Sequence, residues 1–177
     1  MALWQFDIKL LPAEGIMRRY QVIPLVISRA DFDEERWWKG TLVSRHLEAE
    51  FSKILAPAQP WTDKLKVWGH DEGDRIDLWS HDGKNISGIY IRIDVRDISR
   101  VFIANVLNLA RKNAWLLRVE DGRLFQPSFS QLLSAIHASD AFRFVGDPQS
   151  FLEALNKEKE NELREEPSAT LDYTRQK

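Results

Sequence analysis

The stretch Lys64–Arg96, KLKVWGHDEGDRIDLWSHDGKNISGIYIRIDVR, contains three runs in which apolar and polar residues alternate. The runs cover residues 64–67, 75–79 and 89–96, and two short turns rich in aspartate and glycine separate them. Because successive side chains of a strand point to opposite faces, each run predicts a strand with one apolar and one polar face. Three such strands in succession favour an antiparallel sheet with one side on a core.

The chain before this meander also shows strand patterns. Alternation over residues 4–10 predicts a first strand that ends at Pro12. Residues 20–27 predict a second strand, and the intervening residues 13–15 then form a loop. Since Pro24 lacks the amide donor that a central strand needs, we expect this second strand to lie at an edge or to be bulged.

Helical spacing accounts for most of the remaining segments. Asp31–Gly40 begins with an acidic turn, as expected at a helix N-terminus, and Ser44 is placed to cap a helix that reaches about Leu55. The elements predicted downstream are a helix to Lys112 capped by Asp97 or Ser99, a hairpin over 115–126, a helix capped by Ser128, a short strand over 141–145 and a helix that begins at Pro148.

The predicted order of elements does not alternate strictly between strand and helix. It therefore favours an α+β fold, with a mainly antiparallel sheet and helices packed on one face, over a doubly wound parallel sheet. Residues 1–156 are expected to form a single domain. Residues 157–177 are charged and then polar, so we expect a fraying helix end and a loose tail.

Composition excludes several classes of protein. With 25 basic and 27 acidic residues the chain has no basic excess, so no nucleic-acid partner is expected. It contains no cysteine, which excludes disulfides, thiol nucleophiles and cysteine-based metal sites. No apolar run approaches the roughly 20 residues that span a bilayer, and the N-terminus is unlike a signal peptide. We expect a soluble cytoplasmic protein with no membrane partner and no cofactor.

Two turns of the meander repeat a His-Asp pair, at His70-Asp71 and at His81-Asp82. This repetition raises the alternative of a metal-dependent hydrolase. However, the two turns join successive strands and so fall at opposite ends of the middle strand, about 20 Å apart at about 3.3 Å per residue. Because the chain also has no nucleophile elbow and no glycine-rich phosphate loop, a non-enzymatic protein is the preferred interpretation.

The polar side of the meander carries an unexplained row of charges. Arg92, Asp94 and Arg96 occupy alternate positions and so share one face. They form either a solvated ladder of salt bridges or a charged patch for a protein partner. The complete predicted partner-binding set is Asp71, Glu72, Asp74, Trp79, Arg92, Asp94 and Arg96.

Tryptophan is unusually frequent, with seven in 177 residues. Alternation places Trp79 on the polar face, opposite the apolar residues of its strand. Exposed tryptophans are natural interface anchors, since tryptophan and arginine dominate binding hot spots. The alternatives are that the tryptophans fill the core, or that they line a pocket for a small ligand.

Three segments resemble a group of known proteins: Ile89–Arg96, Trp115–Leu117 and Ser139–Leu152. They are similar to small uncharacterised bacterial proteins of the toxin-immunity type, some of which are encoded beside secreted or contact-dependent toxins. The resemblance covers roughly residues 65–155. It implies a cytosolic, non-enzymatic protein that binds and blocks a partner toxin, and it transfers no site residues. The oligomeric state stays open.

Overall fold

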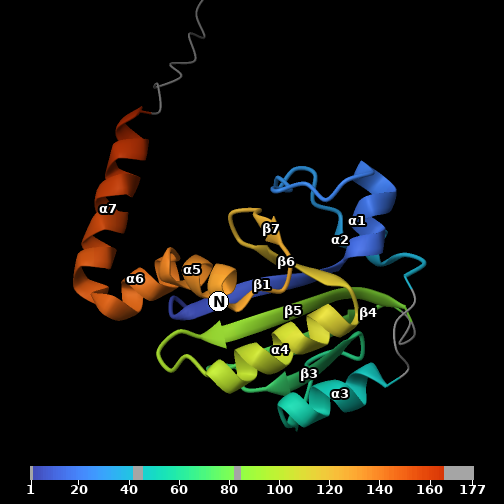
Figure 1. Ribbon diagram of the computed structural model, residues 1–177. Helices are drawn as coiled ribbons and strands as arrows, with labels where there is room; N and C mark the ends of the chain where they lie inside the picture. Colours follow the sequence, from blue (N-terminus) through green and yellow to red (C-terminus); the bar gives the residue numbers. More distant parts are fainter. Residues whose placement is uncertain (1, 42–45, 82–84, 166–177) are drawn as a thin grey trace, which may run out of the picture.

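A seven-stranded antiparallel sheet forms the centre of the protein in the computed structural model (Figure 1). Residues 2–41, 46–81 and 85–165 are described, without the side chains of residues 34, 35 and 158–165. The strand order is β2-β3-β4-β5-β1-β6-β7. The strands are β1 Gln5–Pro12, β2 Pro57–Ala58, β3 Leu65–Gly69, β4 Arg75–Ser80, β5 Ile86–Asp94, β6 Trp115–Val119 and β7 Leu124–Phe125.

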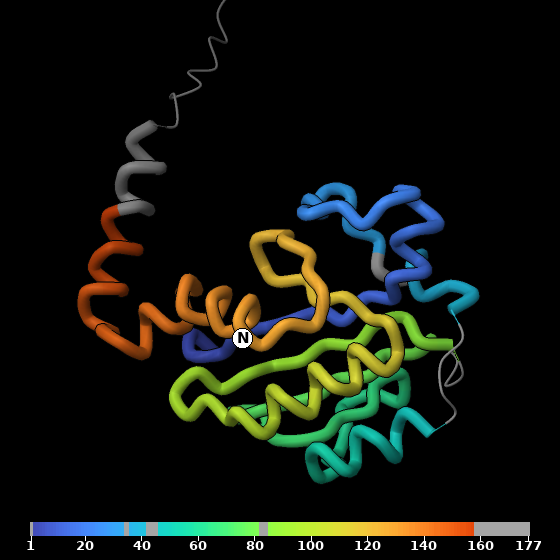
Figure 2. Tube along the Cα trace, viewed as in Figure 1, coloured from blue at the N-terminus to red at the C-terminus, as the bar shows by residue number. Residues whose placement is uncertain are grey.

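The described ranges contain seven helices, four between strands and three after the last strand. The helices are α1 Ala13–Tyr20, α2 Glu34–Trp38, α3 Leu47–Ile54, α4 Arg100–Lys112, α5 Phe129–His137, α6 Asp140–Gly146 and α7 Pro148–Glu165. The first strand, β1, lies in the middle of the sheet between β5 and β6, as the blue segment in Figure 2 shows. The α+β class and the antiparallel sheet predicted from the sequence are confirmed.

The meander β3-β4-β5 has the predicted strands, and its register sets the two faces of the sheet. Ile76 lies opposite Ile91, and both are fully buried. However, Leu65 lies opposite Trp79 and Val67 opposite Asp77. The apolar side chains of β3 therefore lie on the same face of the sheet as the polar side chains of β4. Alternation within a single strand cannot show this, because it does not give the register between strands.

The main core lies on one face of the sheet. It joins the inward side chains of β1, β4, β5 and β6 to the buried faces of α3, α4 and α5, and in Figure 1 α4 crosses in front of β5. Its fully buried members include Ile8, Phe51, Leu107 and Leu132. The spacing of Leu47 and Phe51 on α3 is the helical spacing that the sequence predicted.

A smaller core covers one corner of the opposite face. There Leu11, Leu116 and Leu124 pack with Ile16 of α1, Trp37 of α2 and Ile27. Helix α1 crosses α2 so closely that a Cβ at Gly15 would lie 2.0 Å from the Trp37 carbonyl oxygen. Only glycine fits at this crossing. Helices therefore cover one face fully and a corner of the other.

The predicted second strand over residues 20–27 is wrong, and so is the predicted loop over 13–15. The chain continues from β1 directly into α1, because Ile16 and Tyr20 are one helical turn apart and both pack on the smaller core. Gln21 adopts a left-handed conformation (φ 61°) and ends this helix. Of the following residues, Val26 alone forms a β-bridge, to Arg123.

The predicted strand over residues 141–145 is also wrong, since these residues belong to α6. The Ser139 hydroxyl accepts a hydrogen bond from the Phe142 amide and caps the helix. A free amide at the first turn of a helix costs stability, so a capping serine outweighs the short Phe142/Phe144 alternation.

Other predicted helix boundaries are confirmed. The hydroxyls of Ser99 and Ser128 accept hydrogen bonds from the third amide beyond them, at the starts of α4 and α5. The Asp147 carboxylate accepts from the Ser150 amide at the start of α7. The predicted cap Ser44 and the polar tail over 167–177 lie outside the described residues, whereas most of the charged segment 157–166 continues α7 to Glu165.

Candidate functional site

The polar side of β1, β4 and β5 belongs to neither apolar core, and we call it the ion-pair face. It consists of Asp7, Arg75, Asp77, Arg92, Asp94 and Arg96, together with the acidic turn 71–74. Asp7 lies directly opposite Arg92, and Arg92 directly opposite Arg75, so these three side chains form one row across the sheet. Two arginines side by side require carboxylates around them, and the chain supplies these.

Arg75 is the innermost charge of this face, with only 8% of the residue exposed. Its Nε donates to Asp77 Oδ1 at 2.6 Å, and its Nη1 pairs with Asp71. Arg92 next to it reaches Asp7 more loosely, with an Nε–Oδ1 distance of 3.4 Å. A guanidinium that is removed from water in this way is stabilised only while its carboxylates remain in place.

The acidic turn folds back against the ends of β1 and β5. Gln5 Nε2 donates to the Asp71 carbonyl at 2.6 Å, and Arg96 Nη2 donates to the Glu72 carbonyl at 2.5 Å. The Asp74 carboxyl accepts from the Asp94 amide at 3.0 Å. The structure therefore brings together six of the seven residues that the sequence predicted as a partner-binding set.

Arg96 and Asp94 form the best-aligned pair of the face. Arg96 Nε and Nη2 donate to the two oxygens of Asp94 at 3.0 and 2.8 Å, a bidentate geometry. These hydrogen bonds from Arg96 hold the pKa of Asp94 below its ordinary value. The guanidinium carbon also lies 4.5 Å from the centre of the Trp4 ring. Arg96 is thus fixed on three sides while 44% of its side chain faces solvent.

Asp74 has the opposite electrostatic character. Its pKa is raised to about 6, chiefly by burial, while the hydrogen bond from the Asp94 amide acts to lower it and the charges of Asp94 and Asp97 act to raise it. Burial disfavours the ionised form of a carboxyl group, which explains the direction. The turn therefore carries one carboxyl group that gains or loses its proton near neutral pH.

Trp79, the seventh predicted residue, lies apart from the other six at the far end of β4. Its ring meets that of Trp61 edge-on, with centroids 5.5 Å apart. Trp61 is 75% exposed, and Trp79 is partly buried. Trp61 is a functional candidate that sequence reasoning could not single out, because it belongs to no strand or helix whose periodicity would mark it as exposed.

Four other tryptophans belong to the interior. Trp37, Trp38, Trp68 and Trp115 are each at most 3% exposed. Two surface clefts have volumes of about 500 and 240 Å³. Of the residues that line them, one is a tryptophan, Trp37, and its side chain is buried. The alternative of a tryptophan-lined ligand pocket gains no support from these clefts.

The metal-dependent alternative gains no support from the described residues. His70-Asp71 and His81 lie before and after β4, at its opposite ends, and Asp82 lies outside the described residues. Within the described ranges no three histidine, aspartate or glutamate side chains lie close enough to hold a metal ion.

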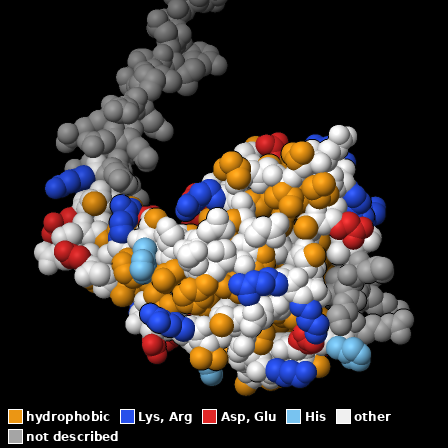
Figure 3. All heavy atoms as spheres, viewed as in Figure 1, with side chains coloured by type: hydrophobic (Ala, Val, Ile, Leu, Met, Phe, Trp, Pro, Cys, Tyr) orange, Lys and Arg blue, Asp and Glu red, His pale blue; other side chains and the backbone are white. Residues whose placement is uncertain are grey.

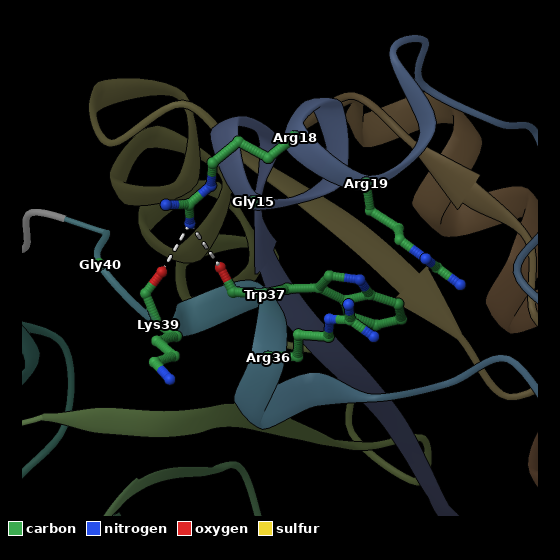
Figure 4. Close-up of a pocket in the computed structure, with 7 residues that line it drawn as sticks. All are labelled: Gly15, Arg18, Arg19, Arg36, Trp37, Lys39 and Gly40. Carbon is green, nitrogen blue, oxygen red and sulfur yellow. Dashed lines mark hydrogen bonds between the residues drawn. The ribbon is translucent and has the colours of Figure 1, made fainter.

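A second surface is formed by α1, α2 and the segment between them. The 500 Å³ cleft lies there, and Figure 4 shows the side chains that surround it. Arg18 Nη2 donates to the Lys39 carbonyl at 2.7 Å and more weakly to the Trp37 carbonyl at 3.4 Å, whereas Arg19 extends away on the other side of the cleft. The lining residues are Gly15, Arg18, Arg19, Arg36, Trp37, Lys39 and Gly40. We call this site the cationic cleft.

The same surface exposes an apolar segment. Met17 and residues 22–26 form what we call the apolar ridge, and Leu25 at its tip is 84% exposed. Hydrophobic side chains gather on the upper part of the view in Figure 3, where this segment lies in Figure 1. The sequence predicted a strand over residues 20–27 and, because of Pro24, placed it at a sheet edge or with a bulge. It gave no sign that these apolar side chains would be exposed, since an apolar run is ordinarily buried.

Comparisons with known proteins add no assignment: no protein-family model, curated protein or solved structure matches the chain. The similarity to immunity-type proteins therefore stays a prediction. Among the described residues, none of the helices combines the length and the apolar character needed to cross a membrane.

Proposed function

We propose that this protein is a non-enzymatic protein-binding module, and that the ion-pair face receives the partner. The observation that carries this proposal is the fixed position of exposed charges. Arg96 is held by Asp94, by the Glu72 carbonyl and by the Trp4 ring, yet almost half of its side chain is open to solvent. A charge that is already ordered loses little entropy on docking, so it contributes more to affinity than a mobile one.

The arrangement also suggests what the partner presents. Asp71 has 86% of its side chain exposed, and Glu72 beside it is exposed too. These carboxylates favour basic side chains on the partner, and Arg96 favours an acidic one between them. Trp61, packed against Trp79, offers an aromatic anchor at the other end of β4.

The similarity to toxin-immunity proteins suggests a biological role for this binding. A bacterial cytoplasmic protein of this type blocks its partner toxin by covering the surface that the toxin uses. A rigid, mixed-charge face without a catalytic set of residues suits such steric blocking, since it provides specificity without chemistry.

A matched pair of variants tests the proposal. Arg96→Glu with Trp61→Ala alters the face. Arg123→Glu with Phe142→Ala serves as the control, because Arg123 bonds Asp121 through the same backbone and side-chain pattern and has 48% of its side chain exposed. In quantitative affinity capture from the native host, we expect a protein that the wild type and the control retain and that the first variant loses at least about tenfold.

Growth of the host and the comparison of capture between variants test the two parts of the proposal separately. The captured protein, expressed alone, should arrest bacterial growth, and co-expression of this chain should restore growth. Equal capture by all three proteins contradicts the assignment of the ion-pair face. Capture without growth arrest contradicts the immunity form of the proposal and leaves protein binding in place.

A further inference from the structure

The apolar ridge concentrates exposed hydrophobic surface in one short segment. Five of the ten large apolar residues that are exposed in the described part of the chain lie between Met17 and Val26. The ridge is not a loose loop. The Leu124 amide donates to the Leu25 carbonyl at 2.8 Å, and the Ile27 amide donates to the Gly122 carbonyl at 2.9 Å. The backbone is thus fixed to the sheet while the side chains project outward, an arrangement that internal packing does not explain.

The cationic cleft lies next to this ridge on the same helix. Four of its seven lining residues are basic and none is acidic. Arg18 is engaged by the carbonyls of α2, but among the described residues no carboxylate pairs with the side chains of Arg19, Arg36 or Lys39. The unpaired cations therefore leave a site of positive potential beside the apolar surface.

Acidic residues occur nearby in the chain without closing this cleft. Asp31 accepts a hydrogen bond from the Ser28 hydroxyl, and Asp33 accepts one from the Arg36 amide at the start of α2. Glu14 lies in the first turn of α1 and does not line the cleft. Among the residues whose side chains are described, no acidic group lines the cleft.

We propose that this surface docks on an anionic lipid bilayer, with the apolar ridge in the interface and a phosphate headgroup in the cationic cleft. The two features adjoin in the chain, since Gln21 ends α1 between the basic residues Arg18 and Arg19 and the ridge residues 22–26. A projecting, uncharged segment enters the headgroup region, and adjacent Arg and Lys side chains bind anionic lipid.

A bilayer fits this surface better than a protein groove does. Leu25 is 84% exposed and the segment from Gln21 to Ser28 carries no charge, so no charged group there would fix the register of a partner protein. Peripheral docking needs no spanning helix, so it differs from the sequence expectation of no membrane partner without requiring a transmembrane segment. The inference is independent of the ion-pair face and of any partner there.

Sedimentation with vesicles tests the inference on the full chain. We expect binding to vesicles of phosphatidylcholine with 30% phosphatidylserine (about one anionic lipid in three) and little binding to pure phosphatidylcholine. Val22→Asp with Leu25→Asp should lower the partition coefficient by at least about tenfold, because both side chains lose the apolar interface. Arg19→Glu, Arg36→Glu and Lys39→Glu together should lower it by at least about tenfold, as should raising the salt concentration to about 1 M.

Matched controls separate this surface from general effects of charge and hydrophobicity. Val101→Asp removes a similarly exposed apolar residue from α4, and Lys53→Glu with Arg100→Glu reverses exposed charges on α3 and α4. These variants should bind like the wild type. Thermal unfolding of every variant, followed by circular dichroism, confirms that each is folded, and the triple charge variant changes only exposed side chains.

Three results would overturn the inference. The first is absence of binding to anionic vesicles, and the second is binding that the ridge and cleft variants leave unchanged. The third is binding of soluble glycerol phosphate by the cleft, seen as shifts of the Arg and Lys resonances in NMR spectra, without partition to vesicles. That result would assign the cleft to a free phosphate ester and leave the ridge to a partner other than a bilayer.

Discussion

The ion-pair face and the surface formed by α1 and α2 use charge in opposite ways. On the ion-pair face, Arg75, Arg92 and Arg96 each have a carboxylate partner. In the cationic cleft, three basic side chains have no such partner among the described residues, and exposed apolar residues lie beside them. The charges of the first region are paired within the fold, whereas the described cations of the second have no carboxylate partner in it. Exposed charge alone therefore does not identify a binding surface, because its internal partners decide its role.

The largest expected effect is a loss of stability from a substitution in the surface formed by α1 and α2, which leaves the ion-pair face unchanged. Gly15→Ala places a Cβ 2.0 Å from the Trp37 carbonyl oxygen, so α1 and α2 must move apart. We expect the free energy of unfolding in urea to fall by about 3 kcal/mol, as for overpacked cores. The distance between α1 and α2, which bound the cationic cleft, should increase at the same time.

Gly146 supplies the control for this substitution. A Cβ there meets no atom within 4 Å, and the residue lies at the end of α6. Gly146→Ala should leave stability unchanged or raise it by about 0.5 kcal/mol, since alanine loses less backbone entropy in a helix. Equal destabilisation by both variants would contradict the close crossing of α1 and α2.

The next largest effect is a loss of stability from removing the buried charge of the ion-pair face. Arg75→Met keeps the apolar stem but removes the guanidinium that pairs with Asp77 and Asp71. Since Asp77 is itself largely buried, with 15% of its side chain exposed, it is left without its cation. We expect the free energy of unfolding to fall by about 2 kcal/mol. The double variant Arg75→Met with Asp77→Leu should recover part of this loss, and no recovery would mean that the pair is not coupled.

These two regions also show how far the sequence predicts this protein. The ion-pair face was predictable because period-two alternation in β5 places Arg92 and Asp94 on the polar side, whatever covers the sheet. Its internal pairing was not, since Asp7 and Arg92 are 85 residues apart and meet only through the register of β1 on β5. The polar side of the meander is only partly solvated: 44% of the Arg96 side chain is exposed, whereas Arg75 on β4 and Leu65 and Val67 on β3, which share this side, are buried.

The second surface was missed for a different physical reason. Residues 20–27 are apolar enough for a strand, and a local pattern says nothing about which apolar run the tertiary fold leaves uncovered. The helix that replaced the predicted strand depends on contacts of Ile16 with Trp37 and Leu116, which are distant in sequence. Capping serines, by contrast, act within four residues, so the starts of α4 and α5 were predictable.

Protonation gives a smaller effect, confined to the ion-pair face. The pKa of Asp74 is raised to about 6 in the folded protein from 3.8, chiefly by burial. Below pH 3.8 both the folded and the unfolded states are protonated at this group. As the pH rises from 3.8 to 6, the unfolded state ionises first, so this group lowers the free energy of unfolding and the loss is complete above pH 6. Because the group is partly solvated, we expect a loss of about 1 kcal/mol.

Asp74→Asn isolates this contribution. Asparagine keeps a side-chain oxygen for the hydrogen bond from the Asp94 amide but does not titrate. The measurement is urea denaturation of wild type and variant from pH 3.5 to 7. The unfolding free energy of the wild type minus that of the variant should fall as the pH rises. The contributions of the other carboxyl groups are the same in both proteins and cancel in this difference. A constant difference across this range would exclude a raised pKa at Asp74.

The smallest expected effect compares two pairs with the same local geometry. Arg96 with Asp94 and Arg123 with Asp121 are both separated by two residues, and in each the arginine amide donates to the aspartate Oδ1 at 3.0 Å. Arg96 has two further contacts, with the Glu72 carbonyl and the Trp4 ring, that connect β5 to the acidic turn. Arg96→Ala should therefore lower the thermal midpoint measurably, whereas Arg123→Ala should leave it within experimental error, because an isolated surface pair contributes little. Equal midpoints for the two variants would mean that the tertiary contacts of Arg96 add nothing to its local pair. The ordered charge on which the proposed docking face depends would then be an ordinary solvated side chain.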